Sequence, residues 1–503
     1  MKQSLKTFPF HFILLPIFFV WHACNEYFGL FPIKYPLQYA AWYLLLAGVL
    51  FVAGWLLFRN IIKAGCLASF LLIVFFFWGS FHDLLRRLHP PHFLVSNAVL
   101  LPLIMIAAIA LIVYYKRKPK TPLRTNRFLN LLFTLFLMME IGVSVFKLIT
   151  ADGVKNNLAY SNLTTAPNLA DLADSSKPDI FLFVFDEYAS SRALKEHMGF
   201  DNAMLDSTLA YNQFYIVRNS RSNYNSTPHS LGSMLDIDYF NKELEGSKSS
   251  AKDLLKARKT LEVSLVPRLL KQKGYQIRNH GLFDLQDHPA HGIVLFENDI
   301  TDALYNETLI ARIEKELAWK WKIPFLEARR KRTIAAHFED EITTTMNNLQ
   351  AGLQELRTET KEPRFVIVHV LLPHEPYFFD RNGKRRESQL NDNAPHLRDS
   401  LYLDQLRYAN TWIDSIAQAA SKPASRGRVV IIEGDHGRRD DPVTGISYIR
   451  DKQFMNLNAF YFSDRDHSML YDSISPVNSF RVVMNKYFQT NLPLLKDSTI
   501  LLH

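Results

Sequence analysis

Residues of types that can bind a metal or transfer a proton stand within or directly after three short apolar segments of this chain. They are Asp186 and Glu187 after 179–185 (DIFLFVF), His369 within and His374 after 364–372 (RFVIVHVLL), and Asp435 and His436 after 428–433 (RVVIIE). Carboxylate oxygens combined with imidazole nitrogens suit zinc or manganese better than calcium. An Asp at a strand end is often only a turn former, but the joint occurrence of these residues favours a site for one divalent metal ion. We expect zinc or manganese there, with magnesium as a third candidate.

A hydroxyl nucleophile for group transfer is offered by the segment 220–240. Thr227 stands just before a stretch that can start a helix, and Ser230 and Ser233 lie one turn apart within it. At a helix N-terminus, backbone N–H groups and the helix dipole lower the cost of negative charge, and a divalent metal lowers the pKa of a hydroxyl further. Ser226 or Thr227 could instead be an ordinary N-cap. Spacing alone leaves both interpretations open.

These residues need a scaffold that brings distant segments together. Four short β-rich segments are nearly continuously apolar, as strands are in a parallel sheet covered on both faces. Helical stretches intervene, and such alternation favours a layered α/β domain with a mainly parallel sheet. In such a sheet, ligands bind beyond the carboxyl ends of the strands, where the acids and histidines stand. The predicted strands are 179–185, 364–372, 428–433 and 457–462, and the main helical stretches are about 260–273, 303–357 and 397–421.

The first 150 residues have the composition of a membrane domain. A helix needs about 20 mainly apolar residues to span a bilayer, and five stretches qualify: about 8–31, 37–57, 61–81, 93–115 and 128–149. With the N-terminus inside, ten Lys and Arg lie on the inner side and four on the outer side, as the positive-inside rule requires. The first stretch lacks a small-residue cleavage site, so we interpret it as a retained anchor. Five spans predict a multi-pass protein of the inner (cytoplasmic) membrane, with everything after residue 150 outside the cytoplasm.

Charge and cysteine content exclude two classes of protein. Residues 1–150 hold 14 of the 58 Lys and Arg but only 3 of the 49 Asp and Glu, so the net charge of +9 belongs to this part alone. A nucleic-acid partner is therefore not expected, because the soluble part carries no basic surplus. Both cysteines, Cys24 and Cys66, lie in apolar stretches, which excludes a disulfide framework and a Cys-ligated zinc site in the soluble part. Polar residues 151–178 are predicted to link the transmembrane domain (1–150) to the α/β domain (179–503).

The order of these motifs resembles the alkaline phosphatase superfamily, in its sulfatase-like branch. That order is a strand-end Asp (Asp186), a hydroxyl about 40 residues later (Thr227), His-x-Pro from His374, and Asp-His-Gly at 435–437. Five spans followed by one extracytoplasmic domain look like the lipid A phosphoethanolamine transferases and lipoteichoic acid synthases. The segment from Thr227 to Met234 is similar to the nucleophile segment of those transferases. The spacing of His369 and His374 matches that of their paired histidines.

The resemblance implies a sulfatase-like fold, a reaction and the roles of six residues. Metal-activated Thr227 would attack a phospholipid and take its headgroup, of phosphoethanolamine or phosphoglycerol type, as a covalent phosphothreonine ester. A hydroxyl of a cell-envelope glycan or lipid would then accept the group. In these roles, the catalytic metal would be held by Asp186, the Thr227 oxygen, Asp435 and His436, and the phosphate group would be contacted by His369 and His374.

The chain also departs from these families. Its soluble part has no cysteine for the disulfides of the phosphoethanolamine transferases, and its first ligand position is Asp where they usually have Glu. The C/S-x-P-x-R segment of true sulfatases is incomplete, because Leu231 replaces the arginine when Thr227 takes the nucleophile position. Glu187 is a candidate second carboxylate, as in the paired Asp of true sulfatases.

Three other hypotheses remain open. The closest is a phosphodiester or sulfate ester hydrolase on the same site, in which water replaces the acceptor. A non-enzymatic envelope protein without metal is the second, and metal analysis distinguishes it. The third is a transporter that uses Glu140, against which the absence of apparent repeats and broken-helix pairs argues.

Three further features each allow a functional and a structural interpretation. Glu140, near the middle of the fifth predicted span, is either functional or paired with a polar residue such as Asn97 or Asn130. The segment 319–332 (WKWKIPFLEARRKR) lies either on the membrane surface or on an ordinary exposed helix face. A possible second metal site, or a set of surface residues, is formed by His280, His288 and His291.

Overall fold

The computed structural model of the chain describes residues 7–30, 32–88, 91–150, 177–240, 246, 250–290, 304–317, 324–386, 397–439 and 450–502. The chain forms two compact units, which we call the helical unit (Met1–Lys155 with Phe296–Glu327) and the α/β unit (Asn156–Leu295 with Ala328–His503). Nearly all of the predicted linker, the tryptophans of 319–332 and His291 lie outside the described residues.

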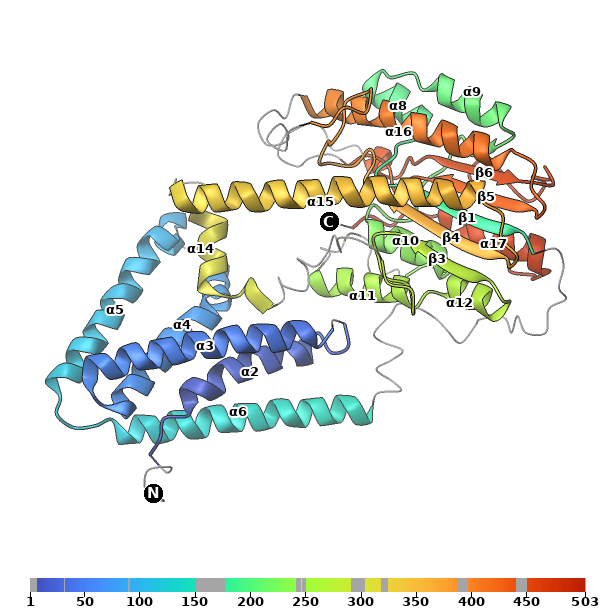
Figure 1. Ribbon diagram of the computed structural model, residues 1–503. Coiled ribbons are helices and arrows are strands. Elements are labelled where there is room, and N and C mark those ends of the chain that lie inside the picture. The colour runs from blue at the N-terminus through green and yellow to red at the C-terminus, as the bar shows by residue number, and fades with distance from the viewer. Residues whose placement is uncertain are drawn as a thin grey trace. The chain divides into compact units, whose positions relative to one another are not determined.

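The helical unit consists mainly of long apolar helices (Figure 1). They are α2 (His11–Glu26), α3 (Lys34–Phe58), α4 (Ile61–Arg87), η1 (His92–Val95), α5 (Asn97–Arg117), α6 (Leu123–Ile149) and α14 (Leu309–Leu317). Among the described residues, α3, α4, α5 and α6 are long and apolar enough to cross a membrane. The sequence predicts five spans, but α2 has only 16 residues, about 24 Å at the rise of an α-helix and shorter than a bilayer core. The structure thus has four helices of spanning length where five are predicted.

Glu140 of α6 is buried and paired with α2. Its Oε1 lies 2.8 Å from His22 Nδ1, and its Oε2 accepts a hydrogen bond from Asn25 Nδ2 at 2.6 Å. The partners that the sequence suggests are wrong, because Asn97 and Asn130 bind other groups. A carboxylate held by two side chains of one neighbouring helix favours a packing role for Glu140.

A segment far along the sequence completes the helical unit. Leu304 is fully buried in its apolar core, and the Tyr43 hydroxyl donates to the Leu304 carbonyl at 2.7 Å. Arg312 Nη2 lies 2.8 Å from the Asp83 carboxylate and 3.0 Å from that of Glu307. The sequence pattern predicts one helical stretch over 303–357, whereas α14 ends before a separate helix, α15, begins. The residues before and within α14 therefore belong to the helical unit.

A six-stranded sheet forms the core of the α/β unit (Figure 1). Its strands are β1 (Asp179–Phe185), β2 (Tyr215–Ile216), β3 (Gln276–His280), β4 (Arg364–Val370), β5 (Arg428–Glu433) and β6 (Asn458–Phe462). Their order across the sheet is β2-β6-β5-β1-β4-β3. β1 is parallel to β4 and β5, and β3 is parallel to β4, but β6 is antiparallel to both β5 and β2. The four predicted strands are present, in a mixed sheet where a mainly parallel one is expected.

The segment between β5 and β6 carries Asp435 and His436. Its described residues also hold a short 3₁₀ helix, η7 (Arg450–Gln453), but no α-helix. β6 runs back beside β5, antiparallel to it.

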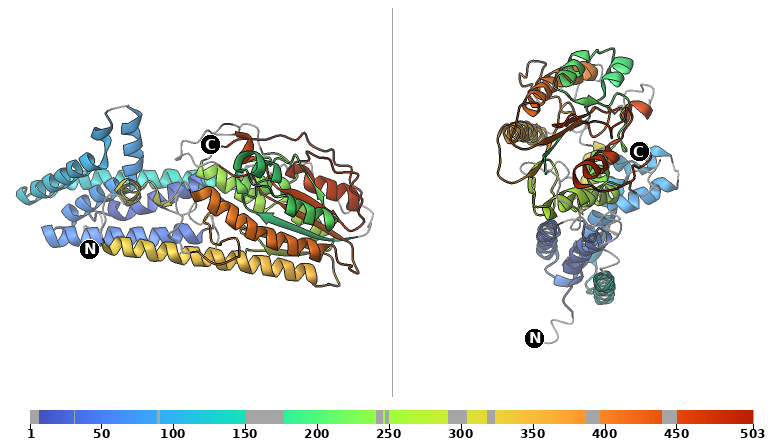
Figure 2. Two further views of the ribbon diagram at one scale, coloured as in Figure 1. Left: turned by 90° about the horizontal axis from the view of Figure 1, so that it is seen from above. Right: turned by 90° about the vertical axis from the view of Figure 1, so that its right-hand side faces the viewer.

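Helices cover both faces of the sheet (Figures 1 and 2). They are α8 (Ser191–Met198), α9 (Ala203–Tyr211), α10 (Thr227–Leu235), α11 (Ala251–Glu262), α12 (Leu265–Gln272), α15 (Pro324–Arg357), α16 (Arg398–Ala420) and α17 (Pro476–Phe488). On one face, α15 approaches so closely that a side chain at Gly352 would overlap Val368. On the other face, Phe480 of α17 packs edge-on against Phe365, with ring centroids 5.7 Å apart. The central strand β1 is buried at every residue, which fixes the position of the residues that follow it.

Candidate metal and nucleophile site

Strand order brings the predicted site residues to one edge of the sheet. β1 lies between β5 and β4, so the residues at the carboxyl ends of these parallel strands are neighbours. Asp186 follows β1, Asp435 and His436 lie just beyond β5, and His369 is the last residue but one of β4. Thr227 begins α10.

Three side chains converge closely enough to hold a metal ion. One ligand atom from each of Asp186, Asp435 and His436 lies within 4.8 Å of the others, and all three residues are buried. Nε2 of His436 lies 3.3 Å from Asp435 Oδ2 and 4.0 Å from Asp186 Oδ1. The same nitrogen lies 3.4 Å from Thr227 Oγ1. The structure thus brings together all four residues expected to be metal ligands.

The hydrogen bonding of His436 leaves one ring nitrogen for this cluster. Its Nδ1 lies 2.8 Å from the Gly437 carbonyl oxygen. A carbonyl can only accept, so Nδ1 carries a proton, and Nε2 is the ring nitrogen left for a metal ion. Asp186 Oδ1 and Asp435 Oδ2 are buried without a hydrogen-bond partner among the described residues. Two buried carboxylate oxygens this close repel one another unless positive charge lies among them, so these residues fit a divalent metal ion.

The candidate nucleophiles differ in their surroundings. Ser226 is the N-cap residue of α10, but its side chain makes no capping hydrogen bond and lies 3.0 Å from His229 Nδ1. The hydroxyls of Ser230 and Ser233 donate to backbone carbonyls. Thr227 contacts His436 at the helix N-terminus, where backbone N–H groups and the dipole favour negative charge. Its position therefore suits a nucleophile better than those of the three serines.

A second group of side chains flanks the cluster. His369 Nε2 lies 3.4 Å from Asp186 Oδ2. His374 Nε2 lies 3.9 Å from Glu187 Oε2 and 3.0 Å from Arg439 Nη2. The backbone N–H of Arg439 donates to Glu187 Oε1 at 2.7 Å. Imidazole and guanidinium groups at this position could donate hydrogen bonds to the oxygens of a phosphate ester.

Charge pairing sets the protonation of this group. Burial would raise the pKa of Asp186, but His374 and the other neighbouring histidines outweigh burial and hold the pKa below its usual value. Burial would likewise raise the pKa of Glu187, which His374 and Arg439 lower. Burial would lower the pKa of His374, but the two carboxylates raise it above its usual value. The carboxylates are therefore ionised near neutral pH, and His374 retains a proton more readily than a free imidazole.

Gln405 of α16 fixes the loop that carries His374. Its Nε2 donates to the His374 carbonyl at 2.8 Å, and its Oε1 accepts from the Phe379 N–H at 3.1 Å. Gln405 is fully buried. The loop is thus held at both ends by one side chain.

Two charged residues at this edge were not predicted from the sequence. Arg439 contacts His374, and the signal for it is the Arg-Arg pair directly after Asp-His-Gly. Glu433 ends strand β5 after four apolar residues, and burial followed by the nearby Asp435 raises its pKa well above the usual value. A carboxyl group in a buried strand is uncommon, so the sequence itself could have marked Glu433 as a candidate site residue.

The described residues contain one candidate metal cluster. His280 lies 3.8 Å from a carboxylate oxygen of Glu355. His280 and His288 belong to no group of potential ligands like that of Asp186, Asp435 and His436. A second site that includes both histidines is therefore not supported.

Similar solved structures cover much of this chain at low identity. The C-terminal periplasmic domain of EcEptC from Escherichia coli is 13% identical over 66% of this chain and 92% of that chain, with a TM-score of 0.39. The integral membrane protein lipooligosaccharide phosphoethanolamine transferase A from Neisseria meningitidis is 13% identical over 95% of this chain and 94% of that chain, with a TM-score of 0.35. A 2-O GAG sulfatase is 12% identical over 65% of this chain and 73% of that chain, with a TM-score of 0.37. No curated protein matches the chain.

A family model covers the site. The Sulfatase model matches residues 181–473, which is more than half of the chain. This range begins in β1 and includes all six predicted site residues. The chain therefore belongs to the sulfatase family, in the sulfatase-like branch of the alkaline phosphatase superfamily, and is a sulfatase-like hydrolase or transferase.

Proposed function

We propose that the chain is a metal-dependent transferase that moves a phospho-alcohol headgroup from a phospholipid to a glycan or lipid of the cell envelope. The headgroup is of phosphoethanolamine or phosphoglycerol type, and Thr227 carries it as a covalent phosphothreonine. One observation carries the proposal: the Thr227 hydroxyl lies 3.4 Å from His436 Nε2 at the start of α10, beside two buried carboxylates.

The metal would be held by Asp186, Asp435, His436 and the Thr227 oxygen. Zinc or manganese suits these ligands best, with magnesium as a third candidate. A divalent ion bound there would lower the pKa of the Thr227 hydroxyl and stabilise negative charge on the phosphoryl oxygens.

Residues of this chain account for both halves of the transfer. Thr227 releases its hydroxyl proton to solvent, Oγ1 attacks phosphorus, and the bond from phosphorus to the lipid oxygen breaks. His374, whose raised pKa favours a bound proton, protonates that leaving oxygen. His369 and Arg439 contact the phosphoryl oxygens. In the second half, an acceptor hydroxyl gives its proton to His374 and attacks the phosphothreonine. The bond from phosphorus to Thr227 Oγ1 breaks, and Oγ1 takes up a proton from solvent, which restores the hydroxyl.

The proposal includes a membrane topology and a domain organisation. Although α2 is shorter than a bilayer core, it joins α3 to α6 as a fifth pass in the inner membrane, because only an odd number of passes leaves the N-terminus inside and the catalytic domain outside the cytoplasm. The excess of Lys and Arg on the predicted inner side supports this orientation. Residues 1–150 are the membrane domain, 151–178 the linker and 179–503 the catalytic domain, which carries 296–327 as an insertion packed with the helical unit.

Intact mass spectrometry of the full chain tests the proposal. The detergent-solubilised protein is incubated with zinc or manganese and a mixture of phosphatidylethanolamine and phosphatidylglycerol. We expect an adduct with the mass of one headgroup on the wild type and on Ser226→Ala, which removes the neighbouring hydroxyl, but not on Thr227→Ala.

The two negative results differ in meaning. Bound metal without an adduct would favour a hydrolase with a short-lived intermediate. The absence of both metal and adduct would contradict an enzymatic role.

A further inference from the structure

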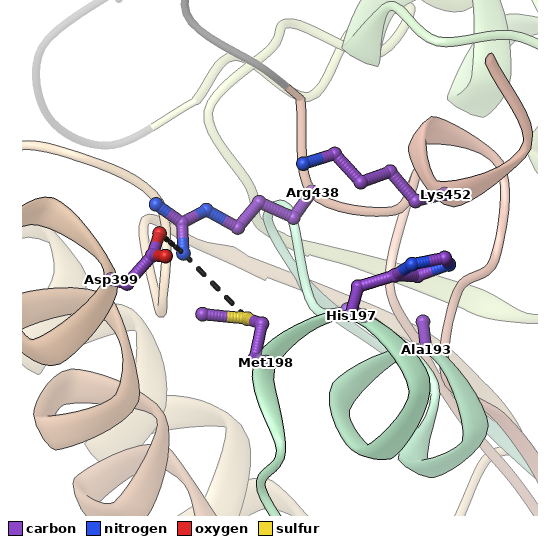
Figure 3. Close-up of a pocket in the computed structure, with 7 residues that line it drawn as sticks. Ala193, His197, Met198, Asp399, Arg438 and Lys452 are labelled. Atoms are coloured by element: carbon purple, nitrogen blue, oxygen red, sulfur yellow. Dashed lines mark hydrogen bonds and ion pairs between the residues drawn. The ribbon is translucent and has the colours of Figure 1, made fainter. Parts of the chain in front are cut away.

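The α/β unit has a small pocket (Figure 3). Two of its lining residues follow metal-ligand candidates closely in the chain: Ala189 stands three residues after Asp186, and Arg438 two residues after His436. The polar side chains of the lining come from α8, the start of α16, the segment after β5, and η7. They are His197, Asp399, Arg438 and Lys452.

The lining is basic, and Arg438 is its central donor. The lining holds two cations and one histidine but a single carboxylate, that of Asp399. Figure 3 shows Arg438 extending toward Asp399 and Met198, with Nη1 at 2.7 Å from Asp399 Oδ1 and 3.6 Å from Met198 Sδ. Both of these contacts are made by Nη1. A guanidinium has five N–H donors, so this one retains donors for an oxyanion.

Arg438 is held in place by a direct link to the candidate metal site. Its guanidinium carbon lies 4.5 Å from the ring centroid of Tyr402, a cation–π distance. The fully buried Tyr402 hydroxyl donates to the Glu187 carbonyl at 2.9 Å and lies 3.2 Å from the Ala189 N–H. Because the guanidinium is already ordered, a ligand that binds it pays little additional conformational entropy.

We propose that this pocket, which we name the acceptor pocket, binds an oxyanion of the acceptor, a phosphate or a carboxylate. This inference rests on the proposed function. The diacylglycerol part of the donor is apolar, and an ethanolamine amine is cationic, so a small basic pocket suits neither. Arginine binds phosphate and carboxylate groups through paired N–H donors. Asp399 competes for the same guanidinium and so limits the affinity for the ligand.

Binding by the metal-free full-length Thr227→Ala protein tests the pocket without turnover. Glucose 6-phosphate, glucuronic acid and neutral glucose are the probes in isothermal titration calorimetry with EDTA present. We expect one or both anions to bind at least about ten-fold more tightly than glucose. The stronger of the two identifies the oxyanion.

Three variants locate the binding. In the Thr227→Ala protein, the further substitution Arg438→Gln should abolish the preference for anions over glucose. The matched control Lys195→Gln removes one cation from α8, where the side chain is 72% exposed and paired with Asp201, and should retain the preference. Asp399→Asn should strengthen anion binding several-fold, a gain that misfolding cannot produce; the Asp399 side chain is 68% exposed. No anion preference, or one that persists in Arg438→Gln, overturns the proposal, as does weaker binding by Asp399→Asn.

A second readout separates this inference from the proposed function. In the wild type, the anionic probe should consume the Thr227 adduct at lower concentrations than glucose does. If no adduct forms at all, the proposed function fails, and the binding result still decides whether the pocket takes oxyanions. If the adduct forms and both kinds of probe consume it equally, the acceptor pocket fails and the proposed function stands.

Discussion

Glu187 donates its backbone N–H to Asp435 Oδ1 at 2.9 Å. The bond joins the segments that follow β1 and β5, and Glu187 has a φ of 60°, in the left-handed region that non-glycine residues seldom adopt. With Oδ1 engaged, Oδ2 lies 3.3 Å from His436 Nε2. The backbone after β1 thus orients the carboxylate of Asp435, and strain of this kind is found mainly at functional sites.

Asp435→Asn should lower metal affinity by on the order of 100-fold or more, since even partners behind a ligand change affinity by 10- to 100-fold. An amide oxygen still accepts from Glu187, so the metal-free protein should keep its thermal midpoint within a few degrees. Competition with a chromophoric chelator measures the affinity. Asp414→Asn, on the exposed side of α16, is the control and should bind metal like the wild type. Unchanged affinity in Asp435→Asn would remove this residue from the ligand set.

Gly434→Ala should destabilise the α/β unit and impair the site. The added Cβ would overlap the Tyr188 carbonyl oxygen and come within 3.1 Å of its carbonyl carbon, and neither backbone atom can move aside freely. Overpacking of this kind costs about 1–3 kcal/mol, or several degrees in the thermal midpoint. Gly427→Ala is the matched control at the other end of β5, where a Cβ comes within 3.0 Å of a side-chain atom, the Ser463 hydroxyl, and lies at an ordinary contact distance of 3.7 Å from Pro178 Cβ. Equal midpoints for the two variants would contradict the prediction.

His467 should make the folded state less stable in acid. Burial lowers its pKa below the usual value of 6.5, and its ring stacks on Phe462 with centroids 5.5 Å apart. The unfolded chain therefore takes up the proton first, so stability is fully present above pH 6.5 and declines below it, until the folded-state pKa is reached. Thermal midpoints between pH 8 and 5 should fall less steeply for His467→Gln than for the wild type. The exposed His337→Gln should follow the wild type; a similar flattening there would show that the effect is not specific to His467.

Arg312 and Asp83 should be energetically coupled. Arg312→Gln leaves the carboxylates of Asp83 and Glu307 without the cation between them, and should lower the thermal midpoint by a few degrees, for about 1 kcal/mol. Asp83→Asn leaves Arg312 paired with Glu307 and should cost less. The double variant should be no less stable than Arg312→Gln alone, because the interaction is already lost. Strictly additive losses would mean that the two residues do not interact.

Local pattern was sufficient to predict four of the six strands of the sheet and the residues at their ends, but not the short β2 and the partly exposed β3. A strand covered on both faces has a nearly continuous apolar sequence, and ligands bind beyond the carboxyl ends of such strands. Asp186 and the Asp435-His436 pair could therefore be singled out. The direction of β6 could not, because the apolar pattern of a strand does not show whether it pairs parallel or antiparallel with its neighbour. The Arg-Arg pair after Asp-His-Gly marks Arg439, but a single sequence does not show that this residue contacts His374, 65 positions away.

The number of spans and the place of α14 show a second limit on what can be predicted from the sequence pattern. Apolarity over 8–31 suggested a span, but the helix there ends at Glu26, and hydropathy does not reveal where a helix stops. The periodicity over 303–357 predicts helical structure, but it does not show which surface each helix packs against. Arg312 finds Asp83 at a separation of 229 residues, so its assignment to the helical unit required the three-dimensional structure.

Biosynthesis of this chain cannot proceed strictly unit by unit. Tyr43 and Asp83 are made early, but their contacts in the finished protein, the Leu304 carbonyl and the Arg312 guanidinium, emerge only after the first three strands of the α/β unit. Domains generally fold as units in the order of their synthesis, whereas this helical unit stays unfinished until residue 312 has left the ribosome. A nascent chain arrested before Leu304 would carry an incomplete membrane bundle, exposed to quality-control proteases.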